Sequence, residues 1–203
     1  MYEFDYINAS LTSAVQIIQM LQSKNSTHFI YQAAEMIAKA FQKGNKLLVA
    51  GNGGSLCDAM HFCEELTGFF RKKRKALPAI PLSDPGYLTC VSNDADFGEV
   101  FARGIEAYGK EGDIFIGLST SGNSENIVRA IYSAKFHKLH TIAFTGKDGG
   151  RIHNLCDLEL LINNNCSARI QEAHMTVIHI IIEEIERRLF TNRHSPEVIY
   201  ETL

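Results

Sequence analysis

Two side chains that can exchange protons or bind a metal, His61 and Glu65, stand four positions apart in this sequence. On a helix, that spacing places them on one face. Imidazole and carboxylate groups are common acid–base catalysts and common ligands of Zn²⁺. The same spacing also occurs in ordinary surface pairs on helices, so the interpretation depends on the residues around them.

The stretch just before this pair predicts an anion site. Residues 46–55 read Lys-Leu-Leu-Val-Ala-Gly-Asn-Gly-Gly-Ser, a short apolar run followed by a glycine-rich loop, and a helical pattern follows. This order is typical of a strand, a tight phosphate-holding loop and a helix N-terminus. A turn before a helix needs glycine in any case, so this loop alone is weak evidence.

A second polar loop strengthens the prediction. The apolar run 114–118 is followed by Ser119-Thr-Ser-Gly-Asn-Ser124. Parallel strands place such loops at the same edge of a sheet, where ligands bind. Hydroxyl and amide groups without a fixed charge suit a phosphate monoester that must be released again. The nucleotide-binding patterns Gly-x-x-x-x-Gly-Lys-Ser/Thr and Gly-x-Gly-x-x-Gly with a later acid are absent from the sequence, which disfavours nucleotides.

Three of the polar residues in the helical segment 168–189 could contribute to a site: Gln171, His174 and His179. At about 100° per residue, His174 lies about 60° to one side of Gln171 and His179 about 80° to the other. We therefore expect the two histidines to enter different surroundings. Helix geometry does not choose which one joins a site, and polar groups satisfied in the core or at an interface are an equally common explanation.

Composition limits the class of protein. The 203 residues are 45% hydrophobic and 21% charged, as in ordered globular proteins, and suffice for one well-packed core. A net charge of -3 gives no general reason to bind nucleic acid or an anionic membrane. The sequence shows no membrane-length apolar run, no secretory signal, and five cysteines without a Cys-x-x-Cys pair. We expect a cytoplasmic protein with reduced thiols.

Apolar runs at 46–50, 77–83, 114–118, 140–146 and 158–162 alternate with helical patterns. This alternation predicts an α/β fold with a parallel sheet covered on both faces. The two prolines in 77–83 indicate an edge strand. Two amphipathic helices precede the first strand, at about 4–21 and after a cap at Ser26, and a neighbouring subunit could cover their apolar faces as well as the sheet could.

A run of five cations, Arg71-Lys-Lys-Arg-Lys75, follows the helix predicted at 55–70. Such a run can steer an anionic substrate or contact nucleic acid, but a solvated connector is the more common explanation. We assign it no role from the sequence.

Several motifs occur together here. They are Ala50–Ser55, Asp58–Glu65, Asn93-Asp94, Ser119–Ser124, Thr145–Gly150 and Arg169-Ile-Gln-Glu-Ala-His174. This set resembles the phosphoheptose isomerases, also called sedoheptulose 7-phosphate isomerases, a bacterial family with the sugar-isomerase (SIS) fold. The resemblance covers nearly everything from Gly44 to Phe190.

The resemblance implies a flavodoxin-like three-layer sandwich around a central parallel sheet, formed by one domain over residues 1–203. Residues 1–43 would be a helical extension used in oligomerisation, residues 44–190 the α/β core, and residues 191–203 a tail. It further implies a homotetramer with active sites between subunits and, as in several members, one Zn²⁺ per subunit.

The implied activity is conversion of sedoheptulose 7-phosphate to D-glycero-D-manno-heptose 7-phosphate through an enediol, toward nucleotide-activated heptose for lipopolysaccharide. By position, Glu65 and His179 would be the acid–base pair. The implied substrate-binding residues are Asn52, Gly53, Gly54, Ser55, Glu65, Asn93, Asp94, Ser119, Thr120, Ser121, Ser124 and Gln171. The implied zinc ligands are His61, Glu65, Gln171 and His179.

Two positions depart from the family pattern, and one relative offers an alternative. Some isomerases carry an arginine and an aspartate where this chain has Phe69 and Ala168, which puts fine substrate preference in doubt. A non-catalytic SIS protein that binds the replication initiator DnaA shares the stretch seen here at 167–175. It lacks counterparts of Glu65 and His179, which this chain keeps, so we favour the isomerase. A sugar-phosphate-sensing regulator would need only the phosphate loops.

Overall fold

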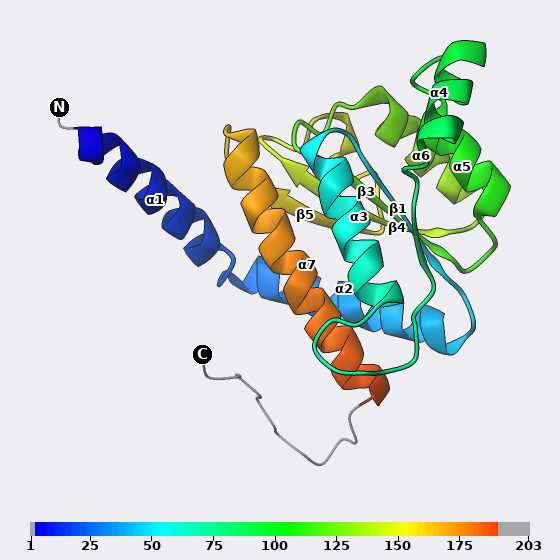
Figure 1. The fold of residues 1–203 in the computed structure, drawn as a ribbon, viewed down its shortest axis with the longest axis horizontal. Helices are drawn as coiled ribbons and strands as arrows, with labels where there is room; N and C mark the ends of the chain where they lie inside the picture. The colour runs from blue at the N-terminus through cyan, green and yellow to red at the C-terminus, as the bar shows by residue number, and fades with distance from the viewer. Residues whose placement is uncertain (1–2, 191–203) are drawn as a thin grey trace.

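The chain forms an α/β fold, described for residues 3–190 in a computed structural model. Five parallel strands lie in the order β2-β1-β3-β4-β5, with helices on both faces of the sheet (Figure 1). This is the flavodoxin-like strand order, so the predicted three-layer sandwich is confirmed. The strands are β1 (Leu47–Gly51), β2 (Ala79–Pro81), β3 (Ile114–Ser119), β4 (His140–Gly146) and β5 (Leu158–Ile162).

The strands form where the sequence predicts them. Every residue of β1 and β3 is buried, as expected of central parallel strands that are covered on both faces. The short strand β2 lies at the edge of the sheet and ends at Pro81. A proline is tolerated at the edge because no second neighbouring strand is there to accept a hydrogen bond from the N–H group that proline lacks.

Alternating strand residues build two separate cores. Val49, Ile116 and Phe144 face one side of the sheet, where they pack with helices α2 (Lys24–Gln42), α3 (Gly54–Thr67) and α7 (Ser167–Phe190). Leu48 and Phe115 face the other side and pack with α5 (Val100–Tyr108) and α6 (Glu125–Phe136). Apart from α1, the remaining helical elements of residues 3–190 are α4 (Pro85–Asp94) and the short 3₁₀ helix η1 (Gly150–Ile152).

Helix α1 (Glu3–Met20) extends away from the rest of the chain (Figure 1). Its large apolar side chains Phe4, Ile7, Leu11 and Val15 are all more than half exposed. Only its C-terminal part enters the core, through Ile17. None of the helices in residues 3–190 is both long enough and apolar enough to span a membrane.

One local prediction is wrong, and one segment left without a role has a structural one. The residue that caps α2 is Ser23 and not Ser26: the Ser23 hydroxyl accepts a hydrogen bond from the Ser26 N–H, as an N-cap residue does with the third residue of its helix. The basic segment 71–75 is more than a solvated connector, because the side chain of Arg74 is only 4% exposed and pairs with Glu186. The predicted tail, 191–203, lies outside the described residues.

His174 is a core residue. It is fully buried on α7, where its Nε2 lies 3.1 Å from the carbonyl oxygen of Thr145, and its ring meets the edge of Phe144. Burial lowers the pKa of His174 to about 4, against a smaller opposing effect of the hydrogen bond to Thr145. The imidazole is therefore neutral at pH 7 and serves packing.

We expect His174 to make the fold sensitive to acid. The pKa of His174 is lower in the folded state than the ordinary value of 6.5. Below pH 6.5, His174 therefore becomes protonated in the unfolded chain but stays neutral in the folded chain, which lowers the free energy of unfolding. Its contribution to stability is complete above pH 6.5 and is lost as the pH falls toward 4. Chemical denaturation at pH 7 and pH 5 measures this loss, and it should be smaller for His174→Gln. The exposed residue His28 gives the control, since His28→Gln should keep the full pH dependence.

Candidate active site

The two glycine-containing loops meet at the carboxyl edge of the sheet. Strands β1 and β3 are neighbours, and the chain turns in opposite directions from β1, toward β2 on one side and β3 on the other. Such a switch point opens a crevice for a ligand. The side-chain amides of Asn52 and Asn126 join the loop after β1 to helix α6 through two hydrogen bonds of 2.9 Å. The Asn52 side chain therefore ties the first loop to the first turn of α6, which directly follows the second loop.

The first loop is shaped by close contacts at its glycines, and the contact at Gly51 is with backbone atoms that no side chain can relieve. A Cβ at Gly51 would overlap the backbone of Ser55, and a Cβ at Gly54 would lie 2.6 Å from the side-chain nitrogen of Gln171. Gln171 also donates a 3.4 Å hydrogen bond to the buried hydroxyl of Ser55. The Ser55 and Leu56 N–H groups donate to the carbonyl oxygens of Asn52 and Gly53, which fixes the turn into α3. The N-terminus of α3 that follows this turn favours an anion through the helix dipole.

The second loop presents hydroxyl groups beside the N-terminus of α6. The hydroxyls of Ser119 and Ser124 lie 3.0 Å apart, and the Ser121 hydroxyl accepts the Asn123 N–H. Thr120 donates a 3.3 Å hydrogen bond to Ser167, the first residue of α7. Three helices, α3, α6 and α7, therefore begin around the two loops.

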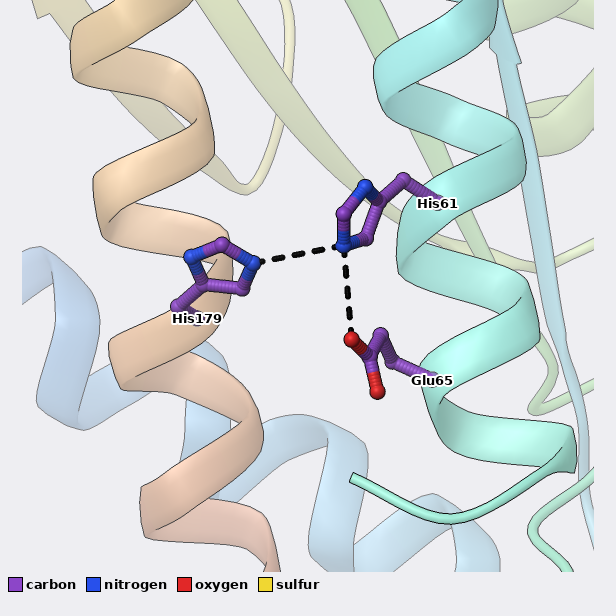
Figure 2. A group of neighbouring side chains, drawn as sticks. All are labelled: His61, Glu65 and His179. Carbon is purple, nitrogen blue, oxygen red and sulfur yellow. Dashed lines mark hydrogen bonds and ion pairs between the residues drawn. The ribbon is translucent and has the colours of Figure 1, made fainter. Parts of the chain in front are cut away.

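The structure brings three of the predicted chemical residues into one cluster (Figure 2). His61 and Glu65 lie on α3, with 3.3 Å between the imidazole Nε2 and the carboxylate Oε1. His179 on the neighbouring α7 points its Nε2 at the same His61 nitrogen, 3.4 Å away. We call these three residues the His-Glu-His cluster. His179, and not His174, is thus the histidine of the last helix that joins the candidate site.

The surroundings of His179 favour its neutral imidazole. Burial lowers the pKa of His179, and the neighbouring His61 lowers it further, against the opposing carboxylates of Glu65 and Glu183. Asp58 lies one turn before His61, and its Oδ2 is buried without a hydrogen-bond partner among the described residues. Burial raises the pKa of Asp58 to about 6, while His61 acts to lower it.

The cluster has the donor set and spacing of a zinc site. Its three ligand atoms lie within 4.8 Å of one another. Ligands about 2.0–2.1 Å from a tetrahedral zinc ion stand roughly 3.4 Å apart, close to the 3.3 and 3.4 Å distances around His61. Two imidazoles and a carboxylate are also the ligands of many catalytic zinc sites, which keep the fourth position open.

Three predicted site residues lie away from the His-Glu-His cluster in this chain. Gln171 contacts the first phosphate loop and stands eight residues before His179 on α7, about 12 Å along the axis. Asn93 and Asp94 are exposed at the end of α4 and hydrogen-bond to each other at 2.8 Å. Within residues 3–190, no hydrogen bond or ion pair joins Asn93 or Asp94 to the other predicted site residues. Their roles, like all the assigned site roles, stay predictions.

Sequence reasoning missed two residues that shape the site. Asn126 is 3% exposed and hydrogen-bonds to Asn52. In the sequence it looks like any polar residue of an amphipathic helix, so no local signal marks it. Phe70 stacks on the ring of His179, with 5.8 Å between centroids and 22° between the planes. Phe70 directly precedes the basic segment 71–75, and nothing in the sequence links it to His179. The two family departures, Phe69 and Ala168, are exposed.

Comparison with known proteins finds one domain family and relatives that share one name. Residues 11–146 match the model of the SIS domain family. A phosphoheptose isomerase of Fusobacterium nucleatum is 53% identical over 166 residues, which are 82% of this chain and 86% of that protein. One of Vibrio cholerae is 49% identical over 191 residues, 93% of this chain and 100% of that protein.

Solved structures agree with the sequence comparison. The phosphoheptose isomerase GmhA from Neisseria gonorrhoeae superposes with a TM-score of 0.85 at 35% identity, covering 91% of this chain and 99% of that one. A phosphoheptose isomerase from Francisella tularensis gives a TM-score of 0.88 at 35% identity, covering 92% and 100%.

Proposed function

This chain belongs to the SIS-domain family of phosphoheptose isomerases, and from that membership we propose that it converts sedoheptulose 7-phosphate to D-glycero-D-manno-heptose 7-phosphate. The protein is an enzyme, an aldose–ketose isomerase acting in heptose biosynthesis. The observation that carries the proposal is the His-Glu-His cluster, built on two helices that begin at the phosphate loops. It supplies acid–base groups at a fixed distance from an anion site.

The distances suit a sugar phosphate. Along α3, His61 lies six residues after Ser55, about 9 Å, a span that a seven-carbon chain can bridge. The phosphate would lie against the helix N-termini and the hydroxyls of Ser55, Ser119 and Ser124. The far end of the sugar would then lie beside Glu65 and His179.

Ketose–aldose exchange moves a proton between two adjacent carbons, C1 and C2, through an enediol. It therefore needs a base at the carbons and a proton donor at the oxygens, a few ångströms apart. Glu65, only 17% exposed, would take the carbon-bound proton. His179, neutral and close to Glu65, would hold and return a proton at the substrate oxygen. The stacked Phe70 would shield one side of His179 from water, while the His61 side chain, 43% exposed, leaves the cluster open to the substrate.

We further propose that the cluster holds Zn²⁺ through His61, Glu65 and His179. When bound, the ion would act as a Lewis acid that polarises the substrate oxygens. A carboxylate bound to zinc would be a weaker base, so the two proposed roles of Glu65, ligand and base, would compete. Gln171, the fourth ligand that the family resemblance implies, lies at the first loop, so a site that uses both Gln171 and His179 would take them from two subunits.

Zinc binding is testable without an activity assay. After treatment with a chelator, the protein should take up about one Zn²⁺ per chain, measured by titration calorimetry and elemental analysis. His61→Ala removes an imidazole from the middle of the cluster and should weaken binding at least 10-fold. His28→Ala removes an exposed histidine on α2 and should leave it unchanged. Equal zinc binding by both variants would place the metal elsewhere.

The proposed reaction has a direct test. The purified protein is incubated with sedoheptulose 7-phosphate, with and without added zinc, and the two isomers are separated and quantified. We expect the aldose product in both preparations or in the zinc-loaded one. No product in either would contradict the isomerase proposal and favour the alternatives, a non-catalytic SIS protein that binds a sugar phosphate or DnaA.

The assembly and setting of the enzyme follow as proposals. The exposed apolar side chains of α1 support a homotetramer in which residues 1–43 form subunit contacts and active sites lie between subunits, around one core of residues 44–190. Light scattering would test this proposal, and any mass other than that of four chains would contradict it. We place the enzyme in the cytoplasm, with its product used for lipopolysaccharide heptose and with no nucleic-acid or membrane partner.

A further inference from the structure

The basic segment 71–75 has a structural role beside the cluster that its composition does not suggest. Arg74 is nearly buried, and its guanidinium donates hydrogen bonds to the carbonyl oxygens of Leu66 (2.7 Å) and Glu65 (2.7 Å) at the end of α3. It also pairs with Glu186 on α7 at 2.6 Å. The segment is therefore fixed to both helices that carry the cluster.

Arg71 makes a second attachment next to the cluster. Its guanidinium lies 2.6 Å from the carboxylate of Glu183, which follows His179 by one turn of α7. The same guanidinium lies over the ring of Phe70, 5.2 Å from its centroid. Phe70 thus directly precedes a segment attached to α7 at Arg71 and Arg74, and its ring lies against His179 of α7.

The His179 imidazole is offset-stacked against Phe70. The two rings are nearly parallel, at 22°, with centroids 5.8 Å apart. His61 meets the same imidazole edge-on, with centroids 5.2 Å apart and 65° between the planes. Rotation of a histidine ring about its Cβ–Cγ bond is soft, so such contacts decide where Nε2 points.

We propose that Phe70 is a positioning residue that holds the His179 imidazole in the orientation needed for proton transfer, with Arg71 and Arg74 fixing the segment that carries it. The inference deepens the proposed function and rests on it. Misplacement of a reacting group by about 1 Å can lower a rate by roughly 100-fold, so loss of this contact should act on the chemical step. Substrate affinity depends mainly on the two phosphate loops, which Phe70 does not touch.

The experiment compares Phe70→Leu with Phe70→Tyr, using Phe136→Leu as the matched control. Phe136 is 83% exposed at the end of α6 and packs against a histidine outside the site, His137. In Phe70→Leu we expect kcat to fall about 10- to 100-fold while KM stays within about threefold. Phe70→Tyr should recover most of kcat, and Phe136→Leu should match the unmodified enzyme.

A spectroscopic readout separates positioning from general damage and from the proposed reaction. In metal-free protein labelled with ¹³C in the histidine rings, the His179 signal is identified by its absence in His179→Gln. Stacking on Phe70 should shift this signal upfield. The shift should disappear in Phe70→Leu and remain in Phe70→Tyr and Phe136→Leu.

An unchanged His179 signal or an unchanged kcat in Phe70→Leu would overturn the inference. If Phe70→Leu does not fold, Arg71→Met removes the Glu183 anchor instead, and an unchanged His179 signal in that variant counts against the inference in the same way. If the unmodified protein does not isomerise sedoheptulose 7-phosphate, the proposed function fails, while the ring-current shift still decides whether Phe70 orients His179.

Discussion

Replacing Glu65 with glutamine should reduce kcat by about 100- to 10,000-fold, the range typical of a lost general base. Glutamine has nearly the same shape but does not accept a proton at neutral pH. The phosphate loops stay intact, so KM should change little, since the missing interaction acts mainly in the transition state. Steady-state kinetics with sedoheptulose 7-phosphate measure both constants, and exchange of the carbon-bound hydrogen with D₂O reports the proton transfer itself.

Glu64→Gln is the control for this experiment. Glu64 is the neighbouring carboxylate on α3, 67% exposed and 3.9 Å from the His61 nitrogen, so the variant makes the same chemical change outside the cluster's close contacts. We expect its kcat to remain near that of the unmodified enzyme. If Glu65→Gln keeps more than about a tenth of the activity, or if hydrogen exchange continues at its normal rate, another group is the base. Zinc content must be measured in both variants, because Glu65 is also a proposed ligand.

The second large effect is expected at Gly122, where alanine should disrupt the second phosphate loop. Gly122 has a φ of +65°, and a Cβ there would overlap the backbone carbonyl of Gly149. The atoms that would collide with it belong to the backbone, so no side chain can move aside. The turn after β4 would have to separate from the loop, breaking the 3.0 Å hydrogen bond from the Ile152 N–H to the Gly122 carbonyl. We expect a loss of about 3 kcal/mol or more.

For a chain of this length, such a loss lowers the melting temperature by roughly 6–12 °C. KM should also rise at least about tenfold, because the hydroxyls of Ser119 and Ser124 would lose their alignment. Gly44→Ala is the control that separates backbone strain at a positive φ from steric overlap of the new Cβ. Gly44 also has a positive φ, +82°, but a Cβ at Gly44 would meet nothing within 4 Å. This control should cost only about 1–2 kcal/mol. Equal melting temperatures for the two variants would show that the contact with Gly149 is unimportant.

Most of the fold could be predicted from the sequence because its signals are local. The strand at 140–146 has its predicted bounds, and the edge position of β2 follows from proline chemistry. The helix starts were less certain. Ser23 and Ser26 are the same residue type three positions apart, and only the backbone conformation of Ser23 shows which one is the cap.

The candidate site was only partly predictable. The spacing of His61 and Glu65 places them on one helix face, and the two loops follow from glycine and serine patterns at strand ends. Helix geometry also separated His174 from His179, and the structure confirms that they enter different surroundings. It could not decide which histidine faces α3, because that depends on the rotation of α7 on the sheet.

By itself, the sequence determined which residues have the chemistry of an isomerase and which of them share a helix face or a strand end. These are properties of neighbouring positions, set by the periods of helix and strand. The tertiary structure alone decided that His179 lies beside His61 and Glu65. It also decided that Asn126 hydrogen-bonds to Asn52 and that Phe70 stacks against His179. Those contacts join residues far apart in the chain, so they depend on how whole helices pack, which no local pattern records.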